Sequence, residues 1–245
     1  RPPTTTPRSN RRQRQMCIRD SSVTDPNNTV ISWEPVTAPK GIKIASYQVV
    51  VERENPLRVL DVQIQPGDTT LFHTHDAPIS YVTIGTSSTD QMALGGAWNN
   101  TRPRTPPLGR IGAVRAVESY AERPLTHRVT NVGSTLFRLI AIPSRRPGSS
   151  AEATGELPGV IVNENRWFRH ATVSIAGGEA SGEHTAAAPT VLVMIRDGRV
   201  AIEHADGWLT SLEMAGQSVV IGEGDRYSIR SGDGQDAELV IVEVR

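Results

Sequence analysis

The segment Gly67-Asp-Thr-Thr-Leu-Phe-His73-Thr-His75 places two histidines one residue apart at the end of a predicted strand. Alternate side chains of a strand point to the same face, with Cβ atoms roughly 6–7 Å apart, so the two imidazoles can converge on one ion. Pro66-Gly67-Asp68 is a turn signal just before this strand. His127 supplies a third imidazole on another predicted strand. Neutral imidazole suits zinc, copper, iron and nickel, so these histidines are a predicted metal site.

The spacing of these histidines resembles that of the cupin superfamily. Gly67-x5-His73-x-His75 is similar to the start of the first cupin motif, G-x5-H-x-H-x3,4-E-x6-G. His127-x3-Asn131 is similar to the end of the second motif, G-x5-P-x-G-x2-H-x3-N. The resemblance covers about residues 42–245 and implies an antiparallel jelly-roll-like barrel.

The departures from both motifs matter for the ligand set. The motif glutamate would fall at Ile79 or Ser80, and neither side chain is a carboxylate. The second motif departs at three positions, which carry Ala116, Glu122 and Pro124. The resemblance therefore implies a site of three histidines, without the glutamate. Asp76 is the nearest acid, but it has the wrong strand parity and we expect it in a turn.

Composition favours an all-β chain with many turns. The 245 residues are 37% hydrophobic and 4% aromatic, with 21 Gly and 17 Pro. The chain has no 18-residue apolar run that would span a membrane. A formal net charge of zero argues against a nucleic-acid module. The only cysteine, Cys17, excludes an internal disulfide.

The first 41 residues are predicted to be a disordered tail. Residues 1–20 carry six Arg and one Asp, a basic segment without apolar periodicity. Residues 15–21 resemble a translated sequencing adapter, and in that interpretation residues 1–20 are not native sequence. We expect a cytoplasmic location by default, and the start without Met leaves open a signal peptide upstream.

Short β-type segments alternate with turn clusters along the rest of the chain, which predicts antiparallel strands. The first barrel is predicted at 42–143 and the second at 166–245, joined by a Pro/Ser/Gly-rich linker at 144–165. The strands expected in the two barrels are 42–51, 58–65, 71–75, 80–85, 111–120, 127–131, 135–142, 168–175, 191–195, 200–204, 216–221, 226–230 and 237–244. The polar, Pro-rich segment 86–109 is predicted to be a loop that closes the site.

The two halves of the chain overlay by spacing and strand order. Gly178-x5-His184 repeats Gly67-x5-His73, with Ala186 in place of His75. Tyr227-x3-Ser231 stands in place of His127-x3-Asn131. The fold prediction is therefore a bicupin, two tandem cupin barrels of which the second has a degenerate metal site.

Further residues are candidates for ligand binding. Arg58 shares parity with hydrophobic neighbours and is a candidate inward anion-binding residue, with an outward salt bridge as the alternative. Tyr81 and Trp98 are candidate walls of the substrate pocket, with ordinary packing as the alternative. His184 and Tyr227 are candidates to line a metal-free pocket in the second barrel, again with packing as the alternative. His170 and His204 are expected at the surface.

Three neutral imidazoles leave a divalent ion with its full charge and open coordination positions, which attract an anionic ligand. The family resemblance implies a three-histidine non-haem oxygenase, because cupins with three-histidine iron include thiol and ring-cleaving dioxygenases. The expected cofactor is one divalent transition metal per chain, iron(II) first, with manganese, nickel, copper or zinc as alternatives. A non-enzymatic small-molecule-binding or sensor cupin is the main alternative function.

An isomerase or epimerase ranks third, because it needs an acid–base pair. Glu118 and Tyr120, expected to share a strand face, are the only nearby candidates. The expected partner is a small-molecule ligand, with neither nucleic acid nor membrane. A homodimer is a further expectation, since sheet edges favour pairing.

Overall fold

The computed structural model describes residues 28–31, 49–52, 57–99, 109–149 and 155–245. These residues form strands and one short 3-10 helix, η1 (Ser119–Ala121). The strands of the first half are β1 (Asn28–Ile31), β2 (Val49–Glu52), β3 (Arg58–Ile64), β4 (His73–His75), β5 (Ile79–Gly85), β6 (Thr89–Ala93), β7 (Val114–Val117), β8 (Leu125–Asn131) and β9 (Phe137–Pro143). Those of the second half are β10 (Val160–Glu164), β11 (Phe168–Ile175), β12 (Ala180–Thr185), β13 (Thr190–Met194), β14 (Val200–His204), β15 (Leu209–Leu212), β16 (Ser218–Ile221), β17 (Arg226–Ser231) and β18 (Ala237–Val244).

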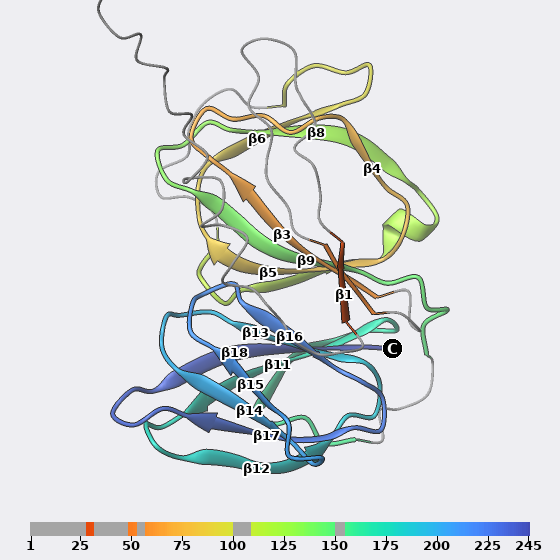
Figure 1. Cartoon of the computed structure of the whole chain (residues 1–245). Helices are drawn as coiled ribbons and strands as arrows, with labels where there is room; N and C mark the ends of the chain where they lie inside the picture. Colours follow the sequence, from red (N-terminus) through yellow and green to blue (C-terminus); the bar gives the residue numbers. More distant parts are fainter. Residues whose placement is uncertain (1–27, 32–48, 53–56, 100–108, 150–154) are drawn as a thin grey trace, which may run out of the picture.

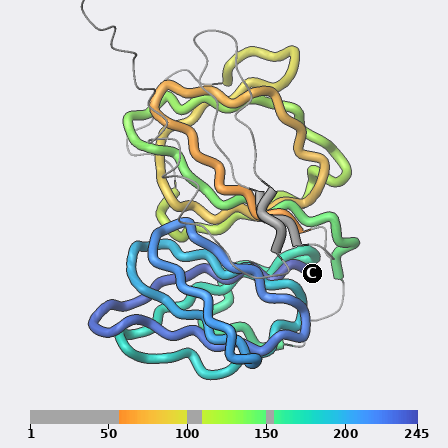
Figure 2. Tube along the Cα trace, viewed as in Figure 1, coloured from red at the N-terminus to blue at the C-terminus, as the bar shows by residue number. Residues whose placement is uncertain are grey.

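Each half of the chain is a barrel made of two antiparallel sheets (Figure 1). The first barrel pairs a six-stranded sheet, β1-β2-β3-β9-β5-β7, with a three-stranded sheet, β4-β8-β6. The second pairs a five-stranded sheet, β10-β11-β18-β13-β16, with a four-stranded sheet, β12-β17-β14-β15. The tube trace shows the two barrels stacked (Figure 2), and the labelled strands show the large sheet of each facing the other (Figure 1). The predicted all-β fold of two tandem antiparallel barrels is confirmed.

A continuous apolar layer joins the two barrels. Side chains alternate between the faces of a strand, so β5 sends Val82 and Ile84 to the second barrel and Tyr81 into the first. The layer contains Phe168, fully buried, from the second barrel. The two barrels therefore share one apolar layer, which covers the facing side of each large sheet.

Polar contacts also cross the layer between the barrels. Ser80 Oγ lies 2.7 Å from His170 Nε2, with both residues fully buried. Arg138 forms an ion pair with Asp61 at 2.8 Å and donates to the Ala215 carbonyl of the second barrel. The expectation of a surface position for His170 is wrong, because its strand is covered on both faces.

The second barrel has a closed hydrophobic interior. Alternate residues of its strands, among them Leu192, Ile202, Ile229 and Ile241, are fully buried in one cluster. The inward side chains of the first barrel, such as Leu60, Val62, Leu139 and Thr83, are only half-buried. The first barrel is therefore the more accessible to a ligand.

Several elements differ from the predicted boundaries. β1 lies within the predicted disordered tail, and β10 lies within the predicted linker. β6 lies inside the predicted closing loop and pairs with β8; residues 100–108 of that loop fall outside the described part of the chain. Gly112 has φ 77°, so the strand predicted at 111–120 begins only at Val114, after a turn. In the described part of the chain, no helix has the length and apolar character needed to cross a membrane.

Candidate metal centre

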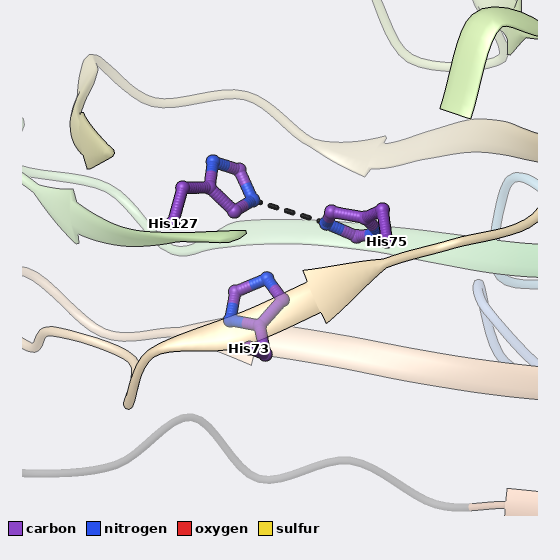
Figure 3. Close-up of side chains that lie close together, drawn as sticks. All are labelled: His73, His75 and His127. Atoms are coloured by element: carbon purple, nitrogen blue, oxygen red, sulfur yellow. Dashed lines mark hydrogen bonds between the residues drawn. The ribbon is translucent and has the colours of Figure 1, made fainter. Parts of the chain in front are cut away.

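The three predicted histidine ligands meet on the inner face of the three-stranded sheet. β4 and β8 are antiparallel neighbours in which His73 lies directly opposite His127. His75 lies two residues beyond His73, on the same face. The ligand nitrogens of all three residues lie within 4.8 Å of one another, and His75 Nε2 is 3.0 Å from His127 Nε2 (Figure 3).

Hydrogen bonds at the far nitrogens of two histidines fix which nitrogen faces the centre. His73 Nδ1 donates to the Leu71 carbonyl at 2.9 Å. His127 Nδ1 lies 3.2 Å from Gln91 Oε1, an acceptor. Both rings therefore carry the proton on Nδ1 and keep the Nε2 lone pair for a ligand, as metal-binding histidines do. These two acceptors are not part of the histidine spacing, so sequence reasoning missed them.

His75 is held by stacking. Its ring lies against that of Tyr120, with centroids 5.1 Å apart and an interplanar angle of 17°. Tyr120 belongs to η1, which connects β7 to β8. The short helix thus places an aromatic ring against His75. Among the described residues, the Nδ1 of His75 has no hydrogen bond, so stacking is the contact that orients this ring.

The site disfavours charged imidazole. Burial, followed by repulsion from His73 and His127, lowers the pKa of His75 to about 4. Burial, followed by repulsion from His73, lowers the pKa of His127 to about 4. At neutral pH these two rings are neutral, which is the form that binds a metal.

The donor set fits a divalent transition metal. Imidazole nitrogens bind such ions at about 2.1 Å, which places adjacent ligands about 3.0–3.4 Å apart for right-angled or tetrahedral geometry. The His75–His127 nitrogen separation of 3.0 Å has this value. His73 is the most exposed of the three, so an ion here has an open side. Donor type alone does not choose among iron, manganese, nickel, copper and zinc.

Tyr81 lies beside this cluster, on the facing sheet. Its ring centroid is 6.4 Å from that of His75. Burial, followed by the neighbouring Tyr120, raises the pKa of Tyr81, so its hydroxyl stays protonated. Arg58 begins β3 with the inward parity of Leu60 and Val62, and its side chain is exposed. The structure thus puts Tyr81 next to the histidines and Arg58 at the rim of the same inner face.

Trp98 lies on the opposite face of the histidine sheet. It covers the guanidinium of Arg128 at 5.0 Å, and Phe72 covers the same group at 5.0 Å. Arg128 follows His127, so the two side chains point to opposite faces of β8. For Trp98 this contact favours the alternative of ordinary packing over a wall of the pocket.

Two acidic residues near the site lie outside it. Asp76 is exposed and forms an ion pair with Arg145 at 2.8 Å, as expected for a turn residue. Glu118 is exposed and precedes η1, whereas Tyr120 lies within that helix. The expectation that Glu118 and Tyr120 share a strand face is wrong, because β7 ends at Val117.

The second barrel repeats the backbone of the site without its ligands. His184 lies directly opposite Tyr227, as His73 lies opposite His127. In both barrels the turn glycine has a positive φ, 80° at Gly67 and 83° at Gly178. The residue after each glycine accepts a hydrogen bond from the end of the paired strand, at Asn131 and Ser231 respectively. The predicted internal repeat is confirmed at the level of strand register.

His184 and Tyr227 lie near each other, with ring centroids 6.0 Å apart. Tyr227 is 1% exposed and belongs to the hydrophobic cluster of the second barrel, together with Ala186. His184 is half-buried and contacts the Ser181 carbonyl through Nε2 at 3.1 Å. Tyr227 therefore lies in the packed interior with the half-buried His184 beside it, and Ala186 leaves no counterpart of the His75 ligand.

Comparison with solved structures supports the tandem cupin fold. AerE from Microcystis aeruginosa aligns with a TM-score of 0.61 at 12% identity, covering 89% of this chain and 97% of that chain. Salicylate 1,2-dioxygenase from Pseudaminobacter salicylatoxidans aligns with a TM-score of 0.54 at 11% identity, covering 81% and 76%. Oxalate decarboxylase from Bacillus subtilis aligns with a TM-score of 0.54 at 12% identity, covering 98% and 84%. No protein-family model matches the chain, and no curated protein matches it in sequence.

These likenesses identify the fold, which is that of a bicupin. Identities of 12%, 11% and 12% leave the reaction open, because one fold hosts many chemistries. What distinguishes the two halves of this bicupin is the three-histidine cluster of the first barrel.

Proposed function

We propose that the first barrel binds one divalent transition metal, with iron(II) as the preferred ion, through His73, His75 and His127. The observation that carries this proposal is the convergence of three imidazoles, two of which have Nδ1 paired to an acceptor so that Nε2 faces the centre. A chance cluster of surface histidines has no reason to share this tautomer.

We further propose that the protein is a non-haem metal oxygenase that acts on a small anionic substrate. A divalent ion held by neutral ligands keeps its charge and its open positions, and it supplies Lewis acidity and, as iron(II), oxygen chemistry. Tyr81 adds a protonated hydroxyl beside His75, and Arg58 adds positive charge at the rim. The names of two structural neighbours, a salicylate dioxygenase and an oxalate decarboxylase, give small carboxylates as their substrates.

The alternative is a non-enzymatic small-molecule-binding or sensor cupin. It is favoured by one observation: none of the inward positions of β3 to β9 is Asp or Glu. A carboxylate general base is therefore missing from these strands, which also disfavours an isomerase or epimerase.

The metal assignment is tested by elemental analysis of the purified chain. We expect about one transition-metal ion per wild-type chain and almost none in a His73→Ala/His75→Ala variant. A His184→Ala/His204→Ala variant is the matched control, because it removes the same number of imidazoles from the second barrel. Equal metal contents in all three proteins would refute the site.

The oxygenase assignment is tested on the iron(II)-loaded protein. Nitric oxide binding that changes when a small carboxylate is added, together with carboxylate-dependent oxygen uptake, supports an enzyme. Ligand binding with no oxygen uptake across such a panel, at full metal occupancy, supports the sensor alternative instead.

A further inference from the structure

Residues of the first barrel can be compared with their equivalents in the second, because the positions of the two barrels match strand by strand. The residue-number difference between His73 and His184 also separates Gly67 from Gly178 and Arg58 from Arg169. Register supports the match: Leu60 of β3 pairs with Ala141, and Ala171 of β11 pairs with Ile241. Arg58 and Arg169 therefore begin equivalent strands on the inward face.

The two arginines differ in what neutralises them. Arg169 is buried, with a side-chain exposure of 8%, and its guanidinium lies 3.4 Å from Glu243, which is 2% exposed. Glu243 lies directly opposite Thr190 in the second barrel, and the corresponding pair in the first barrel is Pro143 opposite Ile79. Arg58 thus has a proline where Arg169 has a carboxylate. Within the described chain, the Arg58 side chain forms no ion pair or hydrogen bond, and its nearest acidic influence is the exposed Asp76, whose pKa it helps to lower after the larger effect of Arg145.

A second pair of positions shows the same contrast. Tyr81 lies opposite Arg115 on the inner face of the first barrel. The corresponding residues of the second barrel are Leu192 and Val219, both in its closed core. The guanidinium of Arg115 is near enough to Tyr81 to lower the pKa of its hydroxyl, against the larger effect of burial. The fold accepts an apolar pair here, so packing does not require the polar pair of the first barrel.

Arg115 is also free of an internal counter-ion. Its side chain is exposed, and it forms no ion pair or hydrogen bond within the described chain. Arg115 lies beside Tyr81 on the neighbouring strand β7, and Arg58 shares the same inner face on β3, which β9 separates from β5; the inward positions of β3 to β9 contain no carboxylate. The inner face opposite the histidines therefore carries two positive charges that no side chain on these strands balances.

We propose that the first barrel binds a small dicarboxylate between the histidine cluster and the Arg58–Arg115 pair, the dianion taking the part that Glu243 plays in the second barrel. The dicarboxylate class rests on the proposed metal site, which takes one carboxylate, while the two arginines and the Tyr81 hydroxyl take the other. Arginine suits this role because its planar donors match a carboxylate. In the second barrel, Tyr227 and Ala186 replace two of the histidine ligands, and the carboxylate of Glu243 already neutralises Arg169. That barrel therefore needs neither a metal nor a dicarboxylate.

The test introduces into the first barrel, at Pro143, the carboxylate that Glu243 provides at the equivalent position of the second barrel. Pro143→Glu supplies a carboxylate opposite Arg58, and Pro143→Gln is the matched control of the same shape without charge. Malonate, succinate and propionate are titrated calorimetrically into the metal-loaded full chain. We expect the dicarboxylates to bind roughly tenfold more tightly than propionate, and Pro143→Glu to weaken them roughly tenfold relative to Pro143→Gln.

A second variant keeps the test decisive if Pro143→Glu folds poorly. Arg115→Val introduces the residue that the second barrel carries at this position, and it should weaken succinate binding by a similar factor. Arg196→Gln, which removes an exposed arginine of the second barrel, should leave binding unchanged. Thermal unfolding of each variant verifies that it is folded.

The outcomes separate this inference from the proposed function. Full metal occupancy with equal affinity for succinate and propionate, or equal affinity in Pro143→Glu and Pro143→Gln, would overturn the dicarboxylate site and leave the metal site standing. Absent metal in the wild type would overturn the proposed function. In that case, succinate binding that depends on Arg58 and Arg115 would still support the arginine pair as an anion site.

Discussion

Acidification should destabilise this protein through His170, the buried histidine between the barrels. His170 is fully buried, its Nε2 lies 2.7 Å from Ser80 Oγ, and burial lowers its pKa to about 4. In the unfolded chain the same group titrates near 6.5. Between these values the unfolded state binds more protons than the folded state, so the free energy of unfolding falls as pH falls from 6.5 towards 4.

The size of the effect follows from the two pKa values. A shift of about 2.5 units corresponds to about 3 kcal/mol when the pH lies well below both values. At pH 5, the free energy of unfolding is lower than at pH 7 by about 2 kcal/mol. The stabilisation is complete above pH 6.5 and is lost as pH falls through the window.

The assay is urea unfolding of metal-free protein at pH 7 and pH 5, for the wild type and for His170→Gln. Glutamine cannot titrate, and its amide can still bond to the Ser80 hydroxyl. His75 and His127 are present in both proteins, so their own acid titration cancels in the comparison. We expect the wild type to lose about 2 kcal/mol more than His170→Gln between the two pH values. Equal losses in the two proteins would refute the argument.

Three other outcomes are expected. Gln91→Leu should reduce metal affinity about 10–100-fold by removing the acceptor of His127 Nδ1, whereas Gln91→Glu should retain most of it, as measured by competition with a chelator. Tyr120→Phe should preserve metal affinity because the ring still stacks on His75, and Tyr120→Leu should reduce it; equal losses in both would contradict a role for stacking. Phe168→Ala should lower the free energy of unfolding by about 3–5 kcal/mol, because it opens a cavity in the layer between the barrels, and chemical denaturation would measure the change.

Much of the fold could be predicted from the sequence because its signals are local. The turn glycine, the two histidines of one face and the alternating hydrophobic segments each need only a few residues to be recognised. The spacing overlay placed His184 and Tyr227 at the positions of His73 and His127, and the strand registers of the two barrels agree with it. β1, β6, β10, β12 and β15 were missed because each is a short strand of four to six residues in a segment dominated by turn-forming or polar neighbours.

The surroundings of the site could not be predicted, because they depend on contacts between segments far apart in the chain. Gln91 reaches His127 only because β6 pairs with β8, and β6 was taken for loop. For Trp98 the sequence left a pocket wall and ordinary packing both open, and only its contact with Arg128 places it on the outer face. His170 could be recognised as buried only once the outer face of its strand was known to be covered by the first barrel.

The shared layer between the barrels explains how a barrel with an accessible interior can keep its ligands in place. β5 presents Ser80, Val82 and Ile84 to the second barrel, while Tyr81 faces the histidines. The packed outer face of this strand therefore holds its inner face in position at the site. A small domain with an open interior buries little apolar surface of its own. The second barrel, with its closed core, supplies this burial, and that gives a structural reason for a barrel without metal ligands to remain in the chain. Phe168→Ala should therefore also weaken metal binding in the first barrel, although Phe168 contacts none of the three histidines, and unchanged metal affinity in that variant would show that the two barrels act independently.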